Sequence, residues 1–397
     1  MSREQLLVIT ERYWPEGSGG ELATHLILEI LRKEFDIVVL TGTRNPTKLP
    51  GVQYIYEPLL AKREKMLLWL NTSRLAGSRR FQKMLRESDV VYIPRFSFPV
   101  IPHAKKLGKK VIVHLHDYIP VSYTATILAP YEDHRYRISQ DDIMLECRRD
   151  LKHCLGVATL WWLPTLARKW LTHADKIICV SKRQADIITD LAPELTSKIE
   201  IAYNPLPQEF VNNSMNKEID DIPTFLYIGS NTYIKGFHII MSIIKGWRAR
   251  ARFILTRISN REIINILNKY NNKDMKIEVY SQLNRDDFIK LHKRSWALLF
   301  PSVWEETFGY AVIEATLSKT VPIAFRAGAL GEVVEGTVME NFVTNVYDVN
   351  QFVKKMAFIS RLSPSEVIAL GDKIRDDVLR KFDMEVIRFR LIKIFEQ

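Results

Sequence analysis

The chain has 397 residues, more than a single hydrophobic core usually serves, so two domains are expected. Hydrophobic residues make up 47% of it and charged residues 26%, which is ample for two cores and ordinary for a soluble protein. No apolar run is long enough to cross a bilayer, and the start of the chain is too polar for a signal peptide. These two exclusions leave a soluble protein or one bound to a membrane surface.

The first half of the chain alternates short apolar runs with helical patterns. A helix is expected over residues 21–33, after a glycine-rich loop at 15–20. The expected strands are residues 6–10, 37–41, 90–93, 111–116, 176–181 and 199–204. This alternation predicts a parallel sheet with helices on both faces.

A polar, proline-containing stretch then interrupts the pattern, and a second series of strands follows it. The second set of expected strands is 224–228, 251–255, 276–280, 297–300 and 321–324. We therefore predict an α/β protein with two doubly wound, Rossmann-like domains that face a central cleft. The predicted parts are a first domain at 1–205, a linker at 206–222, a second domain at 223–375 and a C-terminal helical segment at 376–397. That last segment is expected to pack back on the first domain.

The three cysteines are Cys147, Cys154 and Cys179, and their spacing does not match a metal site. Their odd number argues against a disulfide framework. A reducing compartment, and hence a cytoplasmic location, is the prediction that follows.

Residues 301–315 carry two carboxylates, Glu306 and Glu314, with seven residues between them that include a Thr-Phe-Gly turn. An apolar run precedes them and a helical pattern follows, so a strand is expected to end in a loop that opens a helix. Ligands of open α/β sheets bind at this edge, and a helix N-terminus there attracts anions. The plain alternative is a helix whose first acids serve only its dipole.

This segment resembles the paired-glutamate signature of the retaining nucleotide-sugar glycosyltransferases of family 4, among the glycosyl transferases group 1, which have the GT-B fold. The resemblance implies that Glu314 binds the ribose hydroxyls of the nucleotide and that Glu306 binds hydroxyls of the transferred sugar. Glu305 is expected to be a simple surface acid. The backbone N–H groups implied near the sugar and phosphate are those of Thr307, Phe308 and Gly309.

The loop from Gly229 to Gly236 resembles the family's Gly-Arg…Lys-Gly loop, in which two cations neutralise the diphosphate. Lys235 matches, but Ser230 stands where the family has arginine. Arg257, after the next strand, is a candidate for the missing charge. The family's Gly-x-Gly at that next strand end is absent too, since Thr256 stands there.

In the first domain, Gly19 and Gly20 resemble the family's glycine loop beside the sugar and diphosphate. His114 and His116 alternate on one strand, so they point to the same face. His116 ends the strand, where the family has a catalytically important histidine, and His114 is expected to be structural. The implied catalytic residues are His116, Glu306 and Lys235.

The function implied is the retaining transfer of a sugar from a nucleotide-diphosphate sugar to an acceptor hydroxyl, with the nucleotide on the second domain and the acceptor on the first. The acceptor expected is a glycolipid, a lipid-linked saccharide or a polysaccharide precursor. No cofactor and no metal ion are expected. The alternatives left open are a degenerate nucleotide-sugar binder without activity, a transferase for a soluble small-molecule acceptor, and a GT-B epimerase, which would lack the glutamate pair.

The basic segment from Lys62 to Lys110 holds 13 Lys or Arg residues against three acids, a net charge of +10 in a chain whose total is +11. Leu67, Trp69 and Leu70 stand beside these cations, a pattern typical of a helix lying in a membrane interface. An anionic membrane, at its inner face, is the partner this predicts, and the plain alternative is a solvated basic surface. Nucleic acid is not expected, because no recognition motif accompanies the charge.

Overall fold

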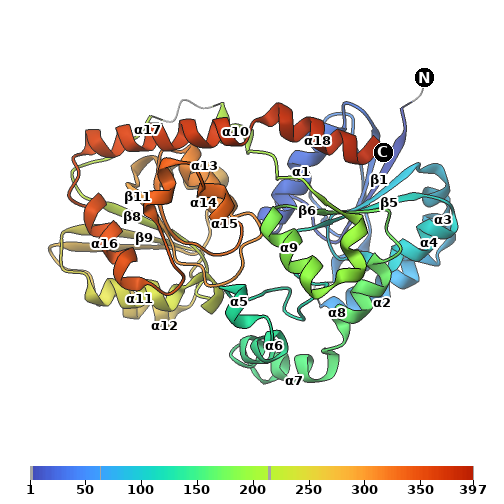
Figure 1. Cartoon of the computed structure of the whole chain (residues 1–397), viewed down its shortest axis with the longest axis horizontal. Coiled ribbons are helices and arrows are strands. Elements are labelled where there is room, and N and C mark those ends of the chain that lie inside the picture. The colour runs from blue at the N-terminus through green and yellow to red at the C-terminus, as the bar shows by residue number, and fades with distance from the viewer. Residues whose placement is uncertain (1–2, 63, 213–215, 397) are drawn as a thin grey trace. The chain divides into compact units, whose positions relative to one another are not determined.

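The structure, a computed structural model, describes residues 3–62, 64–212 and 216–396. Arg63 of the basic segment and residues 213–215 of the predicted linker lie outside the described residues, as do the two first residues and the last. The chain divides into two compact units, which are described separately below (Figure 1). Unit 1 comprises Met1–Thr126, Arg137–Pro205 and Met384–Gln397, and unit 2 comprises Ile127–Tyr136 and Leu206–Asp383.

Unit 1 is built on a parallel sheet whose strand order is β3-β2-β1-β4-β5-β6-β7. Its strands are β1 Gln5–Thr10, β2 Asp36–Thr41, β3 Gln53–Tyr56, β4 Val90–Ile93, β5 Lys110–Leu115, β6 Lys176–Cys179 and β7 Ile199–Ile201. Val8 in β1 pairs with Val39 on one side and Tyr92 on the other, and all three are fully or almost fully buried. Strands covered on both faces need such continuous apolar runs, which is why they were recognisable from the sequence.

Helices and short 3₁₀ segments connect and cover these strands. The helices of unit 1 are α1 Gly19–Leu31, α2 Lys65–Ala76, α3 Arg79–Glu87, α4 Ile101–Lys106, α6 Ile138–Cys147, α7 Leu151–Leu160, α8 Leu163–Leu171, α9 Lys182–Leu191 and α18 Met384–Glu396, with 3₁₀ segments Pro58–Ala61, Phe98–Val100 and Pro193–Lys198. α18 belongs to this unit through Phe395, whose ring lies 5.0 Å from that of Tyr92 and 6.3 Å from that of Phe35.

Unit 2 holds a second parallel sheet, of strand order β10-β9-β8-β11-β12-β13. Its strands are β8 Thr224–Ile228, β9 Ala251–Thr256, β10 Met275–Tyr280, β11 Ala297–Phe300, β12 Val321–Phe325 and β13 Val343–Thr344. Leu298 in β11 pairs with Leu226 in β8 and with Pro322 in β12. The strand order reverses direction at β8 and β11, so the loops after these two strands border the place where such sheets bind ligands.

The helices of unit 2 lie on both faces of this sheet, with α11 and α12 on one side and α13 and α14 on the other (Figure 1). They are α5 Tyr131–His134, α10 Gln208–Val211, α11 Phe237–Gly246, α12 Arg261–Asn268, α13 Arg285–Arg294, α14 Tyr310–Leu317, α15 Leu330–Val334, α16 Val349–Ile359 and α17 Pro364–Lys381, with 3₁₀ segments Tyr233–Lys235 and Val338–Phe342. This architecture confirms the predicted α/β class with two doubly wound domains.

Several details differ from the sequence-based expectation. Residues 127–136 group with unit 2, whereas the prediction placed them in a first domain ending at 205. Unit 2 extends to Asp383, and the part that groups with unit 1 begins at Met384 rather than at 376. Strands β3 and β13 were not predicted, because β3 lies at a sheet edge with half-exposed residues and β13 has only two.

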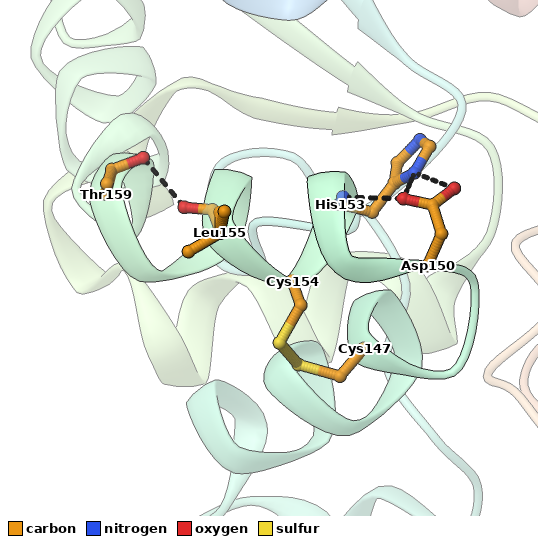
Figure 2. The surroundings of a disulfide bond; sticks show 6 residues. All are labelled: Cys147, Asp150, His153, Cys154, Leu155 and Thr159. Carbon is orange, nitrogen blue, oxygen red and sulfur yellow. Dashed lines mark hydrogen bonds and ion pairs between the residues drawn. A yellow bond between two sulfur atoms is a disulfide. The ribbon is translucent and has the colours of Figure 1, made fainter.

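The expectation about cysteines was wrong. Cys147, at the end of α6, forms a disulfide with Cys154 in α7 (Figure 2), and Cys179 is free and buried. An odd number of cysteines does not exclude one disulfide with a third cysteine left free. Two cysteines seven residues apart can meet across a short turn between helices. Disulfides persist in oxidising compartments, so the cysteines do not support the predicted reducing location.

Within the described part of the chain, every helix is either too short or too polar to span a membrane.

Candidate active site

The loops that follow β8, β9 and β11 bring the predicted residues of unit 2 to one edge of its sheet. β8 leads to Lys235, β9 ends just before Arg257, and β11 leads to Glu306. These three strands are neighbours in the sheet, so their carboxyl ends meet at the same edge. The structure thus collects the residues at the position where open α/β sheets hold their ligands.

Lys235 and Glu306 are in direct contact. The Lys235 Nζ donates to Glu306 Oε1 at 2.7 Å, and the same oxygen accepts from Ser302 Oγ at 2.6 Å and from Trp304 Nε1 at 2.6 Å. Glu306 is buried, and its backbone carbonyl accepts from the N–H of Ala329 at 2.7 Å. Within the described residues no hydrogen bond reaches Oε2, so this second oxygen is the one left to accept from a ligand hydroxyl.

The backbone around Lys235 is shaped by its neighbour Gly236. Gly236 has a φ of 70°, and a Cβ placed on it would lie 1.9 Å from the carbonyl oxygen of Pro301, so no other residue fits. The Tyr227 hydroxyl donates to the carbonyl oxygens of Ser230 (2.9 Å) and Lys235 (3.1 Å). These contacts fix the loop at Ser230 and at Lys235, the two positions where the family resemblance expects a cation.

Glu314 is buried near the start of α14, which begins after Gly309 with a φ of 88°. Its carboxylate forms an ion pair with Arg285, whose Nη2 lies 2.7 Å from Oε1. The same guanidinium nitrogen lies 2.7 Å from Oε1 of Glu209 in α10. Burial raises the pKa of the Glu314 carboxyl, the nearby Arg285 opposes that rise, and Glu209 adds to it.

Arg285 was not found from the sequence. It begins α13, about thirty residues from Glu314 along the chain, and its guanidinium carbon lies 4.7 Å from the ring centre of Phe210 and 5.4 Å from that of Phe288. No local pattern announces such a contact, because it depends on how α10, α13 and α14 pack. A basic residue at the first position of a helix, where acids are favoured, was the only available signal.

Arg257 and Ser230 lie at the predicted edge as well. Arg257 is exposed and has a φ of 60°, and its charge lowers the pKa of Glu314, which places it within electrostatic reach of that carboxylate. The Ser230 hydroxyl is 3.0 Å from that of Thr232. A Cβ on Gly229 would lie 2.5 Å from the Tyr227 ring, so the chain passes close to that ring.

The turn between the two glutamates is tightly packed. Thr307 and Phe308 are both buried, and the Phe308 ring lies 5.1 Å from that of Tyr310 and 5.8 Å from that of Phe382. The side chain of Phe308 is therefore a core group, and a role in ligand binding would fall to its backbone N–H, as the resemblance implied.

Glu305 is not the surface acid that was expected. It is 1% exposed, and its Oε1 accepts from the backbone N–H of Tyr131 at 2.6 Å. The cause is the segment 127–136, which pairs with this loop: Leu128 forms an antiparallel bridge with Trp304. That segment comes from a distant part of the chain, so the sequence did not reveal the contact.

In unit 1, the predicted Gly19 and Gly20 begin α1, and Gly20 lies against His116. A Cβ on Gly20 would come 3.2 Å from the Cβ of His116, which follows β5. Burial lowers the pKa of His116 well below its ordinary value, so the ring is neutral near pH 7. His114 is fully buried with its Nδ1 at 2.9 Å from the Tyr92 hydroxyl, in line with the structural role expected for it.

The sequence-based prediction did not include a buried cluster of charged residues beside His116. Arg95, after β4, donates from Nε to Glu11 Oε1 at 2.8 Å and from Nη1 to Glu21 in α1. Glu21 also accepts from the backbone N–H of Ser18 at 2.7 Å, which ties the glycine loop to this cluster. The sequence shows one acid after β1 and one arginine after β4, but only the strand order makes them neighbours.

Residues 213–368 match the family model described as glycosyl transferases group 1. An uncharacterized glycosyltransferase of Methanocaldococcus jannaschii is 29% identical over 163 residues, which cover 41% of this chain and 43% of that protein. The chain thus matches less than half the length of this curated relative.

Solved structures resemble the fold over its full length. Anabaena HepE, in complex with UDP and glucose, superposes with a TM-score of 0.69 at 14% identity and covers 100% of both chains. An Escherichia coli trehalose-6-phosphate protein bound with UDP-2-fluoro glucose gives 0.66 at 11% identity over 99% of both chains. At these identities the likeness shows the fold alone, and it confirms the predicted GT-B fold.

Proposed function

We propose that this chain, whose residues 213–368 match the glycosyl transferases group 1, transfers a sugar from a nucleotide-diphosphate sugar to an acceptor hydroxyl. The family match confirms the resemblance read from the glutamate motif, and the enzyme class of that family is glycosyl transfer. The structural neighbours with bound UDP, glucose or a UDP-sugar support a nucleotide sugar as the donor.

The observation that carries this proposal is the group of Lys235, Glu306 and Glu314 at one edge of the second sheet. The Lys235 ammonium, which contacts Glu306, is proposed to neutralise the diphosphate leaving group, an electrostatic contribution that is usually large. The free oxygen of Glu306 would accept from hydroxyls of the sugar. Glu314, about one turn into α14, would accept from the ribose hydroxyls.

In the proposed reaction the acceptor oxygen forms a bond to the anomeric carbon and passes its proton to an oxygen of the departing diphosphate. The bond from that carbon to the diphosphate breaks, and the nucleoside diphosphate leaves with the electron pair. We propose that the configuration at the anomeric carbon is retained and that the reaction needs no metal ion, since Lys235 and the N–H groups of Thr307 to Gly309 can meet the negative charge. Arg257 is the proposed second cation in place of the arginine that Ser230 replaces.

Unit 1 is proposed to hold the acceptor, with Gly19, Gly20 and His116 at its binding edge. A neutral His116 can accept or donate a hydrogen bond to a sugar hydroxyl without adding charge. The acceptor that we propose is lipid-linked, and the partner surface is an anionic membrane. Trp69 of the basic segment does not take part, because it is buried with its Nε1 bonded to Phe96 and its ring against Trp170. Leu67 and Leu70 are exposed, as an interfacial face requires.

The first test is the Glu314→Gln variant. Loss of the carboxylate should weaken the binding of the nucleotide donor by about tenfold, because a charged acceptor for two hydroxyls becomes an amide with one acceptor atom. Titration calorimetry would follow a thermal-shift screen of nucleotide sugars, since a ligand of the folded state raises the melting temperature. An unchanged affinity for the donor found in the screen would contradict the assignment of Glu314.

A second candidate, a nucleotide-sugar binder without activity, is supported by Ser230 and Thr256 in place of family residues. A measurement of donor hydrolysis in the absence of an acceptor distinguishes the enzyme from the binder. Slow release of the sugar that is abolished in the Lys235→Met variant supports the enzyme, whereas donor binding without any hydrolysis or transfer supports the binder.

A further inference from the structure

The α6–α7 hairpin, residues 138–160 of unit 1, exposes large apolar side chains. Ile143 is 48% exposed, Leu151 75%, Leu155 58%, and Trp161, just after α7, 68%. Leu151 and Leu155 are one helical turn apart, so they share a face of α7. A soluble surface rarely gathers exposed groups of this size unless they meet a membrane or another molecule.

The charges of this hairpin are sorted between its inner and outer sides. Asp141, Asp142 and Glu146 are buried, and Asp142 accepts from the backbone N–H groups of Tyr123 at 2.8 Å and Thr124 at 3.0 Å. The exposed basic residues of the hairpin and its flank are Arg137, Arg148, Arg149 and Lys152. The one acid exposed beside them, Asp150, caps α7 by accepting from the His153 N–H at 2.9 Å. Arg137 forms an ion pair with Asp141 at 3.6 Å and Arg149 forms one with Glu146 at 3.0 Å. The four basic and four acidic side chains of residues 137–160 balance, so the outer side is apolar with basic groups at its surface.

Helix α2 presents a similar face nearby. Leu67 is 48% exposed and Leu70 46%, and Arg74 follows them on the open side of the helix. The Lys65 ammonium at the start of α2 donates to the carbonyl of Tyr123. A Cβ on Gly156 in α7 would lie 3.2 Å from the Tyr123 hydroxyl, so the turn at Tyr123 lies against both elements. The two faces thus belong to one region of unit 1.

We propose that the outer side of the α6–α7 hairpin, together with Leu67 and Leu70 of α2, is the surface by which this protein lies on an anionic lipid bilayer. This deepens the membrane contact proposed above and rests on it. Leucine and tryptophan side chains enter the boundary between headgroups and acyl chains, and exposed basic residues such as Lys152 of α7 and Arg74 of α2 meet anionic headgroups. The basic segment from Lys62 to Lys110, which contains α2, has a net charge of +10, and an anionic surface is the partner that complements it.

The disulfide holds the two helices of the hairpin together. It joins the last residue of α6 to the first turn of α7, and α6 and α7 lie apart from the strands of the unit 1 sheet (Figures 1 and 2). Leu151 and Leu155 are therefore presented on a helix whose place beside α6 is covalently fixed. A rigid apolar face loses less conformational entropy when it inserts than a mobile one would.

The test is co-sedimentation of the full chain with vesicles of phosphatidylcholine and phosphatidylglycerol, against vesicles of phosphatidylcholine alone. The variant is Leu151→Ser with Leu155→Ser, and the matched control is Val386→Ser with Phe389→Ser, two equally exposed apolar residues of α18. We expect the hairpin variant to lower the partition coefficient for anionic vesicles at least tenfold and the control to leave it within about twofold. Salt should weaken the binding of the unaltered protein.

Absence of binding to anionic vesicles, or equal losses in the hairpin variant and the control, would overturn the proposal. So would sedimentation equilibrium that finds a dimer dissociated by the hairpin substitutions, since the face would then be an interface between copies. All substituted side chains are exposed, so both variants should fold, as their melting temperatures will show. Nucleotide affinity serves as an independent readout: the hairpin variant should keep it, whereas failure of the proposed function would show as no nucleotide binding in the unaltered protein.

Discussion

Glu306 and Glu314 lie on the same loop and helix, yet their carboxylates are held in different ways. Glu306 has one oxygen fixed by three donors, from Lys235, Ser302 and Trp304. Glu314 depends on a guanidinium, that of Arg285, which it shares with Glu209. The first arrangement tolerates the loss of one partner, because two donors remain. The second makes the ionisation of Glu314 sensitive to a single residue outside the motif.

The largest effect is expected from Lys235→Met. If Lys235 neutralises the leaving diphosphate, its loss should lower kcat for sugar transfer by about 100-fold or more. Glu306 keeps its bonds to Ser302 and Trp304, so its position should change little and nucleotide affinity should fall less than kcat. Steady-state kinetics with the donor found in the screen would measure both. Lys245→Met, an exposed lysine of α11, is the control, and equal kinetics for the two variants would contradict the role of Lys235.

Arg285→Gln should change how nucleotide affinity depends on pH. Without the nearby positive charge, the pKa of Glu314, already raised by burial, rises further. In its proposed role Glu314 would bind ribose hydroxyls best as a carboxylate, so affinity should fall as the pH falls through this pKa. In the variant the fall should begin at a higher pH. A shift of one pKa unit means about tenfold weaker binding on the sloping part of the curve.

Glu209→Gln is the matched control for Arg285, because the Glu209 charge raises the pKa of Glu314. Its removal should move the fall in affinity to a lower pH, opposite to the effect of Arg285→Gln. Arg257 also faces Glu314 and is kept in both variants. Calorimetric titrations from about pH 5 to pH 8 would compare the three proteins. If the affinity of all three proteins fell over the same pH range, Arg285 would not set the ionisation of Glu314.

The smallest expected effect concerns the turn between the two glutamates. Gly309→Ala should destabilise the fold by about 1 kcal/mol, since its φ of 88° strains any residue with a Cβ and that Cβ would lie 2.8 Å from Leu330 Cδ2. Gly246→Ala, at the end of α11 with open space around the Cβ, should be neutral or stabilising by up to about 1 kcal/mol. Urea unfolding would measure both, and a destabilised Gly246 variant or an unaffected Gly309 variant would contradict this reasoning.

The sequence was sufficient for features that depend on local pattern. Continuous apolar runs predicted the central strands of both sheets, and the spacing of Glu306, Gly309 and Glu314 predicted a loop that opens a helix. It was insufficient for contacts that depend on how helices and loops pack. Arg285 reaches Glu314 from another helix, Glu305 is covered by residues 127–136, and Cys147 meets Cys154 across a turn. These contacts follow from packing, which leaves no periodic trace in the chain.

The grouping of Met384–Gln397 with unit 1 has a consequence for dividing the protein. Because the first and last segments of the chain both belong to that unit, unit 2 consists of two insertions within it, Ile127–Tyr136 and Leu206–Asp383. A fragment that stops at the end of unit 2 would leave Phe35 and Tyr92 without the ring of Phe395, and Glu200 without Arg390. Expression of unit 1 alone would therefore need α18 joined back by a linker, in place of the excised segment Leu206–Asp383.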